Sequence, residues 1–396
     1  MTMLLASVTG VSEAQLALDH GADIIDLKDP TKGALGALDA DIVRSVVSIV
    51  AGRRPTSAVT GDLPMNPEIV IAAVRSMAET GVDYVKVGLF PGSAQRECIR
   101  ALAPLAAATK IVAVMFADSE PDNALIPLMA EAGFAGAMLD TARKGAGRLL
   151  DHAGLAALGQ FVHACRACGL LTGLAGSLEA PDVPRLLLLA PDYLGFRGAL
   201  CAAHDRKSAL DPTSFDLIRA LIPADPRGVV VSRHESPIAD YWVLAARGYS
   251  GAPTKDDTAK DHVFVHDFEL PVCIGVYENE HRSPQRVRFN VDAETTRAIH
   301  AAEDIRDVLS YDVITDAIRL IAAEGHIPLV EMFAERVANF VLSHARVERV
   351  TVKVEKLDVV SGRVGVEISR QRPADTAKVY HLYPAAAGKG GAGTPE

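Results

Sequence analysis

The sequence predicts an α/β protein in which a (β/α)8 TIM-like barrel is followed by a smaller α+β domain. Eight short apolar or β-branched runs alternate with stretches of helical periodicity over residues 1–222. The runs are almost continuously apolar, which is typical of parallel strands buried on both faces. A doubly wound open sheet is the alternative, but no GxGxxG motif follows the first run, and eight units favour a closed barrel.

The expected strands are separated by segments whose apolar residues recur every three or four positions, as in residues 42–50. Helix-start residues precede several of these segments, namely Ser12, Asp39 and Pro67. We therefore expect helices between the strands. The expected strands are residues 3–7, 22–28, 56–62, 84–90, 110–118, 136–141, 171–177 and 193–199.

This alternation ends near residue 223. Prolines and a polar Lys-Asp-Asp run indicate a linker over residues 223–261. Residues 262–370 contain two strand patterns, two helix patterns and two further strand patterns, which predict an α+β domain. The Ala/Gly/Lys/Pro-rich residues 371–396 are expected to form a disordered tail. The elements expected in the second domain are strands 262–270 and 286–291, helices 312–324 and 329–343, and strands 347–356 and 362–369.

Composition excludes several classes of protein. The chain has 40 basic and 50 acidic residues, and its net charge of -10 argues against a nucleic-acid partner. The N-terminus lacks a basic signal-peptide region, and no apolar run reaches the roughly 18 residues of a membrane span, so we expect a cytoplasmic protein without a membrane partner. Five scattered cysteines fit a reducing compartment. Cys165 and Cys168 form a lone CxxC within a helical pattern, and we expect no metal or cofactor.

Charged residues recur at the carboxyl ends of the expected barrel strands, where chemistry gathers in this fold. Desolvated, crowded lysines have a lowered pKa, and a neutral lysine attacks carbonyls while nearby carboxylates move protons. An ion-pair network that holds the barrel rim is the alternative. Recurrence of lysine and aspartate, where a stable core would have Val or Ile, favours catalysis. Alternation along the strands directs these residues toward the lumen or its mouth: Asp26, Lys28, Thr60, Asp62, Lys86 and Asp140.

Three loops extend this candidate site. Lys144 lies four residues after Asp140 in a basic, glycine-rich loop. The seventh and eighth strands end in Gly176–Ser177 and Arg197–Gly198. Small residues there expose backbone N–H groups, which form the usual phosphate site of this fold, and Arg197 would add a bidentate contact. Solvated loop residues and tight turns are the alternative interpretation.

These barrel motifs resemble the (5-formylfuran-3-yl)methyl phosphate synthase family over essentially the whole of residues 1–222. The motifs are DIIDLKDP at 23–30, TGD at 60–62, YVKVGL at 84–89, LDT at 139–141 with Lys144, and LAGS at 174–177. The resemblance implies condensation of two glyceraldehyde 3-phosphate molecules, with loss of phosphate and water, on the way to methanofuran. It implies Lys28 as the Schiff-base lysine, Lys86 as a second essential amine, and Asp140 and Lys144 as acid–base partners. Asp26 and Asp62 are expected to bind substrate. Val59 before the TGD motif departs from the family pattern.

The second domain resembles dihydroneopterin aldolase in its motifs at 274–280, 310–312, 329–331 and 352–356. The resemblance implies a T-fold domain, a pterin substrate and a ring-shaped oligomer with its site between subunits. Glu331 would hold the pterin through two hydrogen bonds, and Lys356 would move a proton in retro-aldol cleavage. Tyr311 would act as an acid or stack on the pterin, and Glu280 would position the side chain of the pterin. Each residue also has an ordinary structural interpretation, and Leu357 replaces the proline usual after the lysine.

Together the two resemblances imply a bifunctional enzyme that serves methanofuran and tetrahydromethanopterin, two cofactors of one-carbon metabolism. The first alternative is another Schiff-base aldolase of sugar phosphates with a different product. The second makes the C-terminal domain a non-catalytic pterin-binding or oligomerisation module.

Overall fold

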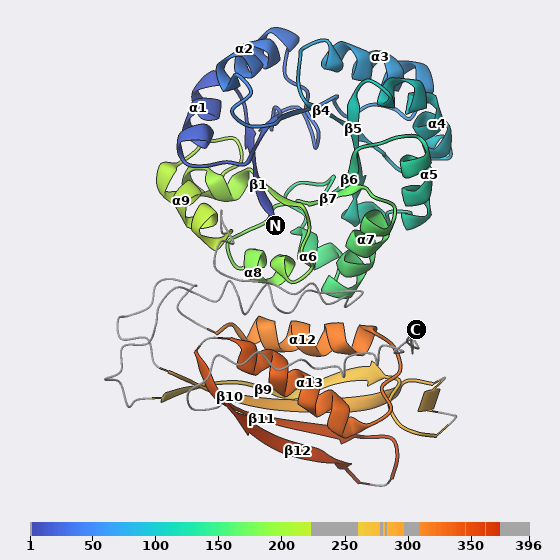
Figure 1. Ribbon diagram of the computed structural model, residues 1–396, viewed down its shortest axis with the longest axis vertical. Coiled ribbons are helices and arrows are strands. Elements are labelled where there is room, and N and C mark those ends of the chain that lie inside the picture. The colour runs from blue at the N-terminus through green and yellow to red at the C-terminus, as the bar shows by residue number, and fades with distance from the viewer. Residues whose placement is uncertain are drawn as a thin grey trace, which may run out of the picture.

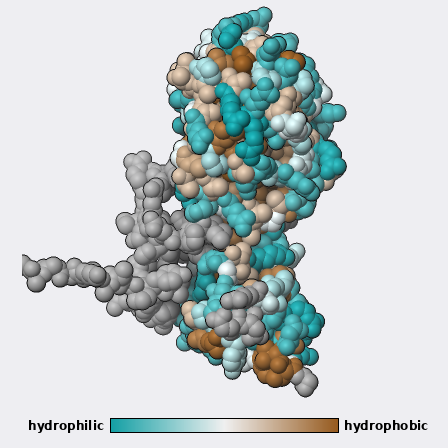
Figure 2. Space-filling view, turned by 90° about the vertical axis from the view of Figure 1, so that its right-hand side faces the viewer, coloured by the Kyte–Doolittle hydropathy of each residue, from teal (hydrophilic) through white to brown (hydrophobic). Residues whose placement is uncertain are grey.

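The computed structural model describes residues 2–222, 260–277, 280–281, 283–296, 309–344, 346–360 and 362–372. These residues form a closed barrel and a second, smaller domain (Figure 1). Most of the predicted linker and of the predicted tail lies outside the described residues. In Figure 2 the two domains form two lobes joined at a waist, with hydrophilic residues spread over the barrel face in view. Within the described residues, no helix is both long enough and apolar enough to span a membrane.

The barrel has eight parallel strands in chain order, and it closes where β1 pairs with β8. The predicted (β/α)8 architecture is therefore confirmed. The strands are β1 (Met3–Val8), β2 (Ile24–Leu27), β3 (Thr56–Val59), β4 (Tyr84–Gly88), β5 (Lys110–Phe116), β6 (Gly136–Asp140), β7 (Leu171–Leu174) and β8 (Tyr193–Phe196). The helices are α1 (Val11–Asp19), α2 (Ala40–Val50), α3 (Pro67–Ala78), α4 (Gln95–Ala106), α5 (Ile126–Glu131), α6 (Leu149–His152), α7 (Leu155–Ala167), α8 (Asp182–Leu187) and α9 (Pro212–Leu221).

The barrel lumen is filled by side chains from alternate strand positions, separately from the layer between strands and helices. Gly173 of β7 is paired with Tyr193 of the neighbouring strand β8. A Cβ on Gly173 would lie 2.3 Å from the Tyr193 ring, so only glycine fits there. The apolar lumen cluster includes Leu5, Ile24, Val59, Val112, Val114, Phe116, Met138 and Tyr193.

The alternation expected for β3, which points Thr60 and Asp62 toward the mouth of the barrel, has the opposite parity in the structure. Strand β3 ends at Val59, and it directs Ser57 and Val59 into the lumen. The chain turns out of the strand after Val59, and the Thr60 hydroxyl donates to the Lys86 carbonyl of the neighbouring strand. Simple alternation therefore fails beyond the last strand residue.

The second domain is a four-stranded antiparallel sheet in the order β12-β11-β10-β9, with two helices on one face (Figure 1). The α+β prediction is confirmed, and the first strand begins two residues before the expected boundary at 262. The strands are β9 (Lys260–Val272), β10 (Gln285–Thr296), β11 (Val347–Lys356) and β12 (Val364–Gln371), and the helices are α12 (Tyr311–Ala323) and α13 (Val330–Ser343).

Helix α12 lies between the sheet and the barrel, where it packs against α7 and α8 (Figure 1). Its buried residues occupy more than one face, as expected for a helix covered on two sides. Arg185 of α8 and Asp316 of α12 form an ion pair across this contact. The two domains are therefore joined by direct packing as well as by the chain.

Candidate active site

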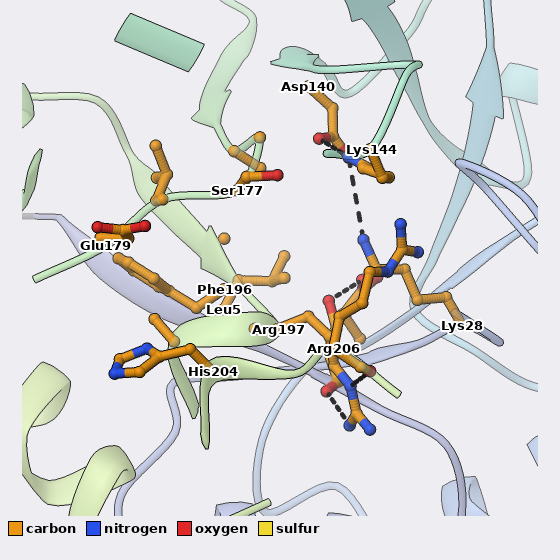
Figure 3. A pocket seen from close by; sticks show the side chains of 18 of the residues that line it. Leu5, Lys28, Asp140, Lys144, Ser177, Glu179, Phe196, Arg197, His204 and Arg206 are labelled. Carbon is orange, nitrogen blue, oxygen red and sulfur yellow. Dashed lines mark hydrogen bonds and ion pairs between the residues drawn. The ribbon is translucent and has the colours of Figure 1, made fainter. Parts of the chain in front are cut away.

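A cavity of about 290 Å³ opens at the carboxyl end of the barrel strands (Figure 3). Five charged residues expected there line it together: Asp26, Lys28, Lys86, Asp140 and Lys144. They come from β2, β4, β6 and the loops that follow β2 and β6. The structure thus gathers residues that lie up to 118 positions apart in the chain.

Asp26 and Lys86 form a buried ion pair at the floor of the cavity. Lys86 Nζ donates to Asp26 Oδ1 at 2.7 Å. The hydroxyls of Ser7 and Ser57 also donate to Asp26, at 2.9 and 2.6 Å. Burial opposes ionisation of Asp26, but the charges of Lys86 and Lys28 outweigh it and lower the pKa of the carboxyl. The Lys86 ammonium is therefore held in place by a fixed anion.

Lys28 is buried with only weak pairing. Its side chain is 11% exposed, and its Nζ lies 3.9 Å from Asp140 Oδ2, beyond hydrogen-bond distance. Burial lowers the pKa of Lys28 to about 8, and the nearby cations Lys144 and Lys86 act in the same direction. A substantial fraction of this amine is therefore neutral near pH 8.

Asp140 and Lys144 form a short contact beside Lys28. Lys144 Nζ donates to Asp140 Oδ1 at 2.5 Å, and the Thr141 backbone N–H donates to the same oxygen. Burial opposes ionisation, but Lys144 and Lys28 hold the pKa of Asp140 well below its usual range. Asp118 accepts hydrogen bonds from two backbone N–H groups of the loop that carries Lys144, which positions the loop. An ionised carboxylate therefore lies within reach of any group bound on Lys28.

The loops after β7 and β8 line the same cavity, as the sequence predicts. Gly176, Ser177 and Gly198 are all lining residues. Gly176 has φ of 121°, and a Cβ there would lie 2.9 Å from the Thr141 side chain. Ser177 has the left-handed φ of 50°. Their contact with a phosphate stays a prediction.

The structure gives Arg197 many protein partners. It donates to both Glu13 carboxylate oxygens, at 2.6 and 3.2 Å, and to the carbonyls of Ser7, Arg206 and Ser208. These bonds use all five of its N–H donors. Arg197 lines the cavity and holds the loop after β8, and its predicted contact with substrate stays a prediction.

Asp62 also has backbone partners. Its two oxygens accept hydrogen bonds from the N–H groups of Ala34 and Leu35, at 2.9 and 2.8 Å. It does not line the cavity described above. Asp62 thus holds the loop after β2, in which Leu35 is buried, and its predicted contact with substrate stays a prediction.

In the second domain the structure brings two of the four predicted residues together. Lys356 Nζ donates to Glu280 Oε1 at 2.7 Å, and this bond lowers the pKa of Glu280 to about 2. Gly275 lies against that carboxylate, and a Cβ there would be 1.9 Å from it. Tyr311 and Glu331 lie in the first turns of α12 and α13 and are exposed. Within the described ranges neither of them forms a hydrogen bond or ion pair with Glu280 or Lys356.

Sequence reasoning missed Arg206, a cavity residue in the loop after β8. It lies ten residues beyond the end of β8, and it matches no periodicity. Its position two residues after His204, close beyond the expected phosphate loop at 197–199, is the signal that could have identified it.

Residues 4–219 match the family model described as 4-HFC-P synthase, and residues 263–369 match the model described as dihydroneopterin aldolase. The first match covers more than half of the chain. Both resemblances inferred from the motifs are therefore confirmed at the level of the family.

Several relatives match about half of this chain. A relative from Methylorubrum extorquens is 46% identical over 208 residues, which cover 52% of this chain and 86% of the relative. The (5-formylfuran-3-yl)methyl phosphate synthase of Methanopyrus kandleri is 38% identical over 215 residues, which cover 51% of this chain and 91% of that enzyme. The enzyme of the same name from Methanococcus maripaludis is 35% identical over 216 residues, which cover 52% of this chain and 92% of that enzyme.

Two solved structures are also similar to parts of the chain. E. coli dihydroneopterin aldolase in complex with neopterin is 30% identical, with a TM-score of 0.26, and the match covers 28% of this chain and 98% of that one. Phosphoribosyl anthranilate isomerase from Thermus thermophilus is 16% identical, with a TM-score of 0.42, and covers 56% and 98%.

Proposed function

The chain belongs to the 4-HFC-P synthase family, and we propose that its barrel joins two glyceraldehyde 3-phosphate molecules through an imine on Lys28. The environment of Lys28 carries this proposal. Its amine is buried, has a pKa of about 8, and lies 3.9 Å from an ionised carboxylate that is itself held by Lys144. Such an amine is both nucleophilic and close to a proton acceptor.

The proposed cycle begins when Lys28 Nζ attacks the carbonyl carbon of one triose phosphate and water leaves. A proton then leaves the neighbouring carbon to Asp140, and the resulting enamine forms a carbon–carbon bond with the aldehyde of the second molecule. Lys144 returns protons to the oxygen atoms that leave as water and as phosphate. Ring closure, in which a hydroxyl of the second molecule attacks the imine carbon, breaks the bond to Lys28 and releases it as the free amine. Over the whole cycle two triose phosphates give one furan aldehyde phosphate, one inorganic phosphate and two waters, without net oxidation.

Borohydride reduction in the presence of glyceraldehyde 3-phosphate tests this proposal. We expect mass spectrometry to find a covalent adduct on Lys28 in the parent protein. Lys28→Arg should form none and lose activity, because a guanidinium keeps the charge but forms no imine. Lys207→Arg, an exposed substitution, is the control. An adduct on another lysine alone would overturn the assignment, and an aldol product without furan absorbance would favour a simple sugar-phosphate aldolase.

For the second domain we propose retro-aldol cleavage of a dihydroneopterin-type pterin. The Glu280–Lys356 pair supports it, because the lysine is held at a carboxylate that Gly275 closely covers. Among the described residues Tyr311 and Glu331 form no hydrogen bond or ion pair with Glu280 or Lys356. This supports assembly into a homo-oligomer, in which a second copy would supply the missing side chains. Light scattering of the full chain tests the assembly, and a monomer with full aldolase activity would contradict it. A domain that binds pterin without turnover is the alternative.

A further inference from the structure

Among the residues that the structure describes, Arg206 differs from Lys86, Lys144 and Arg197 of the barrel cavity because it has no carboxylate partner. Lys86, Lys144 and Arg197 each have a carboxylate oxygen within 2.7 Å. Arg206 makes one hydrogen bond, from Nη2 to the Gly33 carbonyl at 3.3 Å, and no ion pair with any residue that the structure describes. Figure 3 shows its side chain extending into the cavity on the side of Lys28 and Lys144.

The loop that carries Arg206 is ordered by its own contacts. Cys201 and Leu210 pair across the base of the loop. Arg197 donates to the carbonyls of Arg206 and Ser208, at 2.9 and 2.8 Å. The loop also contains two successive left-handed residues, Ala203 and His204, with φ of 53° and 56°. Non-glycine residues in this conformation cost energy and persist where the surroundings impose them, often at ligand sites. The loop thus presents Arg206 in a fixed position.

The Arg206 guanidinium is a partly buried cation without a paired carboxylate among the described residues, and an anion bound in the cavity could pair with it. Burial lowers the pKa of Arg206 below its ordinary value, while the carboxylates of Asp140 and Asp62 act from a distance in the opposite direction. A partly desolvated cation without a paired anion is costly. A phosphoryl group would supply that anion, and the planar guanidinium matches two of its oxygens.

We propose that Arg206 binds the phosphoryl group of the second glyceraldehyde 3-phosphate, the molecule that the enamine attacks. This inference rests on the proposed function, since condensation of two phosphorylated substrates needs two anion sites in one cavity. The backbone N–H groups of the loops after β7 and β8 can hold one phosphate. Arg206, whose guanidinium extends to the Gly33 carbonyl in the loop after β2, supplies the other.

The test compares Arg206→Gln with Lys207→Gln, which removes the same charge from an exposed neighbour in the same loop. Each full-length protein is incubated with glyceraldehyde 3-phosphate and borohydride, and the adducts on Lys28 are weighed by mass spectrometry. We expect Arg206→Gln to keep the three-carbon adduct within about twofold of the parent. Its six-carbon adduct and its rate of furan formation should fall about 10- to 150-fold, the range for a lost hydrogen bond to a charged group.

A second variant, Arg206→Lys, keeps the positive charge but loses the paired N–H donors of the guanidinium, and it should recover part of the six-carbon adduct. Equal loss of both adducts in Arg206→Gln and Arg206→Lys, with unchanged circular dichroism, would overturn the assignment, since Arg206 would then serve the first substrate. Arg206→Gln behaving like Lys207→Gln would also overturn it. Absence of any adduct on Lys28 in the parent would instead contradict the proposed function, which keeps the two failures distinguishable.

Discussion

Arg185 and Asp316 join the two domains through a bidentate ion pair. Arg185 Nε donates to one Asp316 oxygen at 2.5 Å, and Nη2 donates to the other at 3.1 Å. The carboxylate is 1% exposed. One turn earlier in α8, Asp182 accepts hydrogen bonds from Arg148 and from the backbone of Glu179, which lines the barrel cavity. The contact between the domains therefore lies close to the wall of the candidate active site.

Removing Arg185 should destabilise the chain. In Arg185→Ala, the Asp316 carboxylate stays buried with Arg319, at 3.3 Å, as its remaining partner. We expect the free energy of unfolding in urea to fall by about 2–4 kcal/mol. The control is Arg44→Ala, which breaks an exposed pair with Asp41 and should cost at most about 1 kcal/mol. Equal effects of the two variants would show that the pair does not hold the domains together.

The fragment of residues 1–222 should remain a closed barrel, because each strand is paired within it. We expect it to form furan product with a kcat near that of the full chain. In place of the oligomer proposed for the full chain, the fragment should aggregate when concentrated, because the surfaces of α7 and α8 that α12 covers become exposed. Activity assays and light scattering of both proteins check this. A soluble but inactive fragment would show that the second domain shapes the barrel site.

Imine formation should rise with pH around the pKa of Lys28, about 8, because only the neutral amine attacks. Two neighbours shift that pKa in opposite directions. Asp140 raises it and Lys144 lowers it. We therefore expect the midpoint of borohydride trapping to move to lower pH in Asp140→Asn and to higher pH in Lys144→Met. Trapping yields measured between pH 6 and 10 give both midpoints, and shifts in the same direction would contradict the assignment of these charges.

The same pKa affects stability. Between pH 8 and 10.5 the unfolded chain keeps a proton on Lys28 that the folded chain has lost, so this residue makes stability increase with pH in that window. Lys28→Met should remove this contribution. Urea denaturation at pH 8 and at pH 10 gives the change in the free energy of unfolding for the parent and for Lys28→Met. An equal change in the two proteins would argue against a depressed pKa of Lys28.

The barrel and most of its charged lumen could be predicted because parallel strands are regular. Alternation placed Asp26, Lys86 and Asp140 correctly, since each lies within its strand. It failed for Asp62, which lies three residues beyond the end of β3 and serves a loop. Loop conformation depends on contacts far away in sequence, and periodicity does not describe it.

Ion pairs and hydrogen bonds between residues far apart in the sequence could not be predicted, for the same reason. Arg185 and Asp316 lie 131 residues apart and on different domains, and no local pattern distinguishes them. The sequence position of Arg197 predicts a phosphate contact, which stays a prediction. The sequence does not show that Glu13, 184 residues earlier, also binds its guanidinium. Hydrogen-bond saturation is a property of the folded chain.

The second domain offers a separate prediction about pterin binding. Glu331 lies in the first turn of α13 and makes no hydrogen bond or ion pair with any described residue, so its carboxylate is available to a ligand. In Glu331→Gln one acceptor oxygen is replaced by an NH2 group that faces the donor edge of a pterin. We expect affinity for neopterin, titrated by fluorescence with the full-length protein, to fall roughly 30-fold or more. Glu335→Gln, on the same helix and paired with Arg370, is the matched control.

Lys356→Met should slow cleavage and leave pterin binding nearly unchanged, whereas Glu331→Gln should weaken binding. Its amine already has Glu280 as partner, so the lysine contributes a proton and a charge to cleavage more than it contributes contacts to recognition. Loss of the amine should leave neopterin binding within about threefold and slow cleavage by two to four orders of magnitude, the usual range for a general acid or base. Glu280 would then titrate nearer its ordinary pKa, because the hydrogen bond from Lys356 is the main cause of its depression. Tight binding without measurable cleavage in the parent protein would show that the domain holds pterin and does not turn it over.

The two variants also separate binding from cleavage. Unchanged pterin binding in Glu331→Gln would show that Glu331 acts only as a favourable charge at a helix N-terminus.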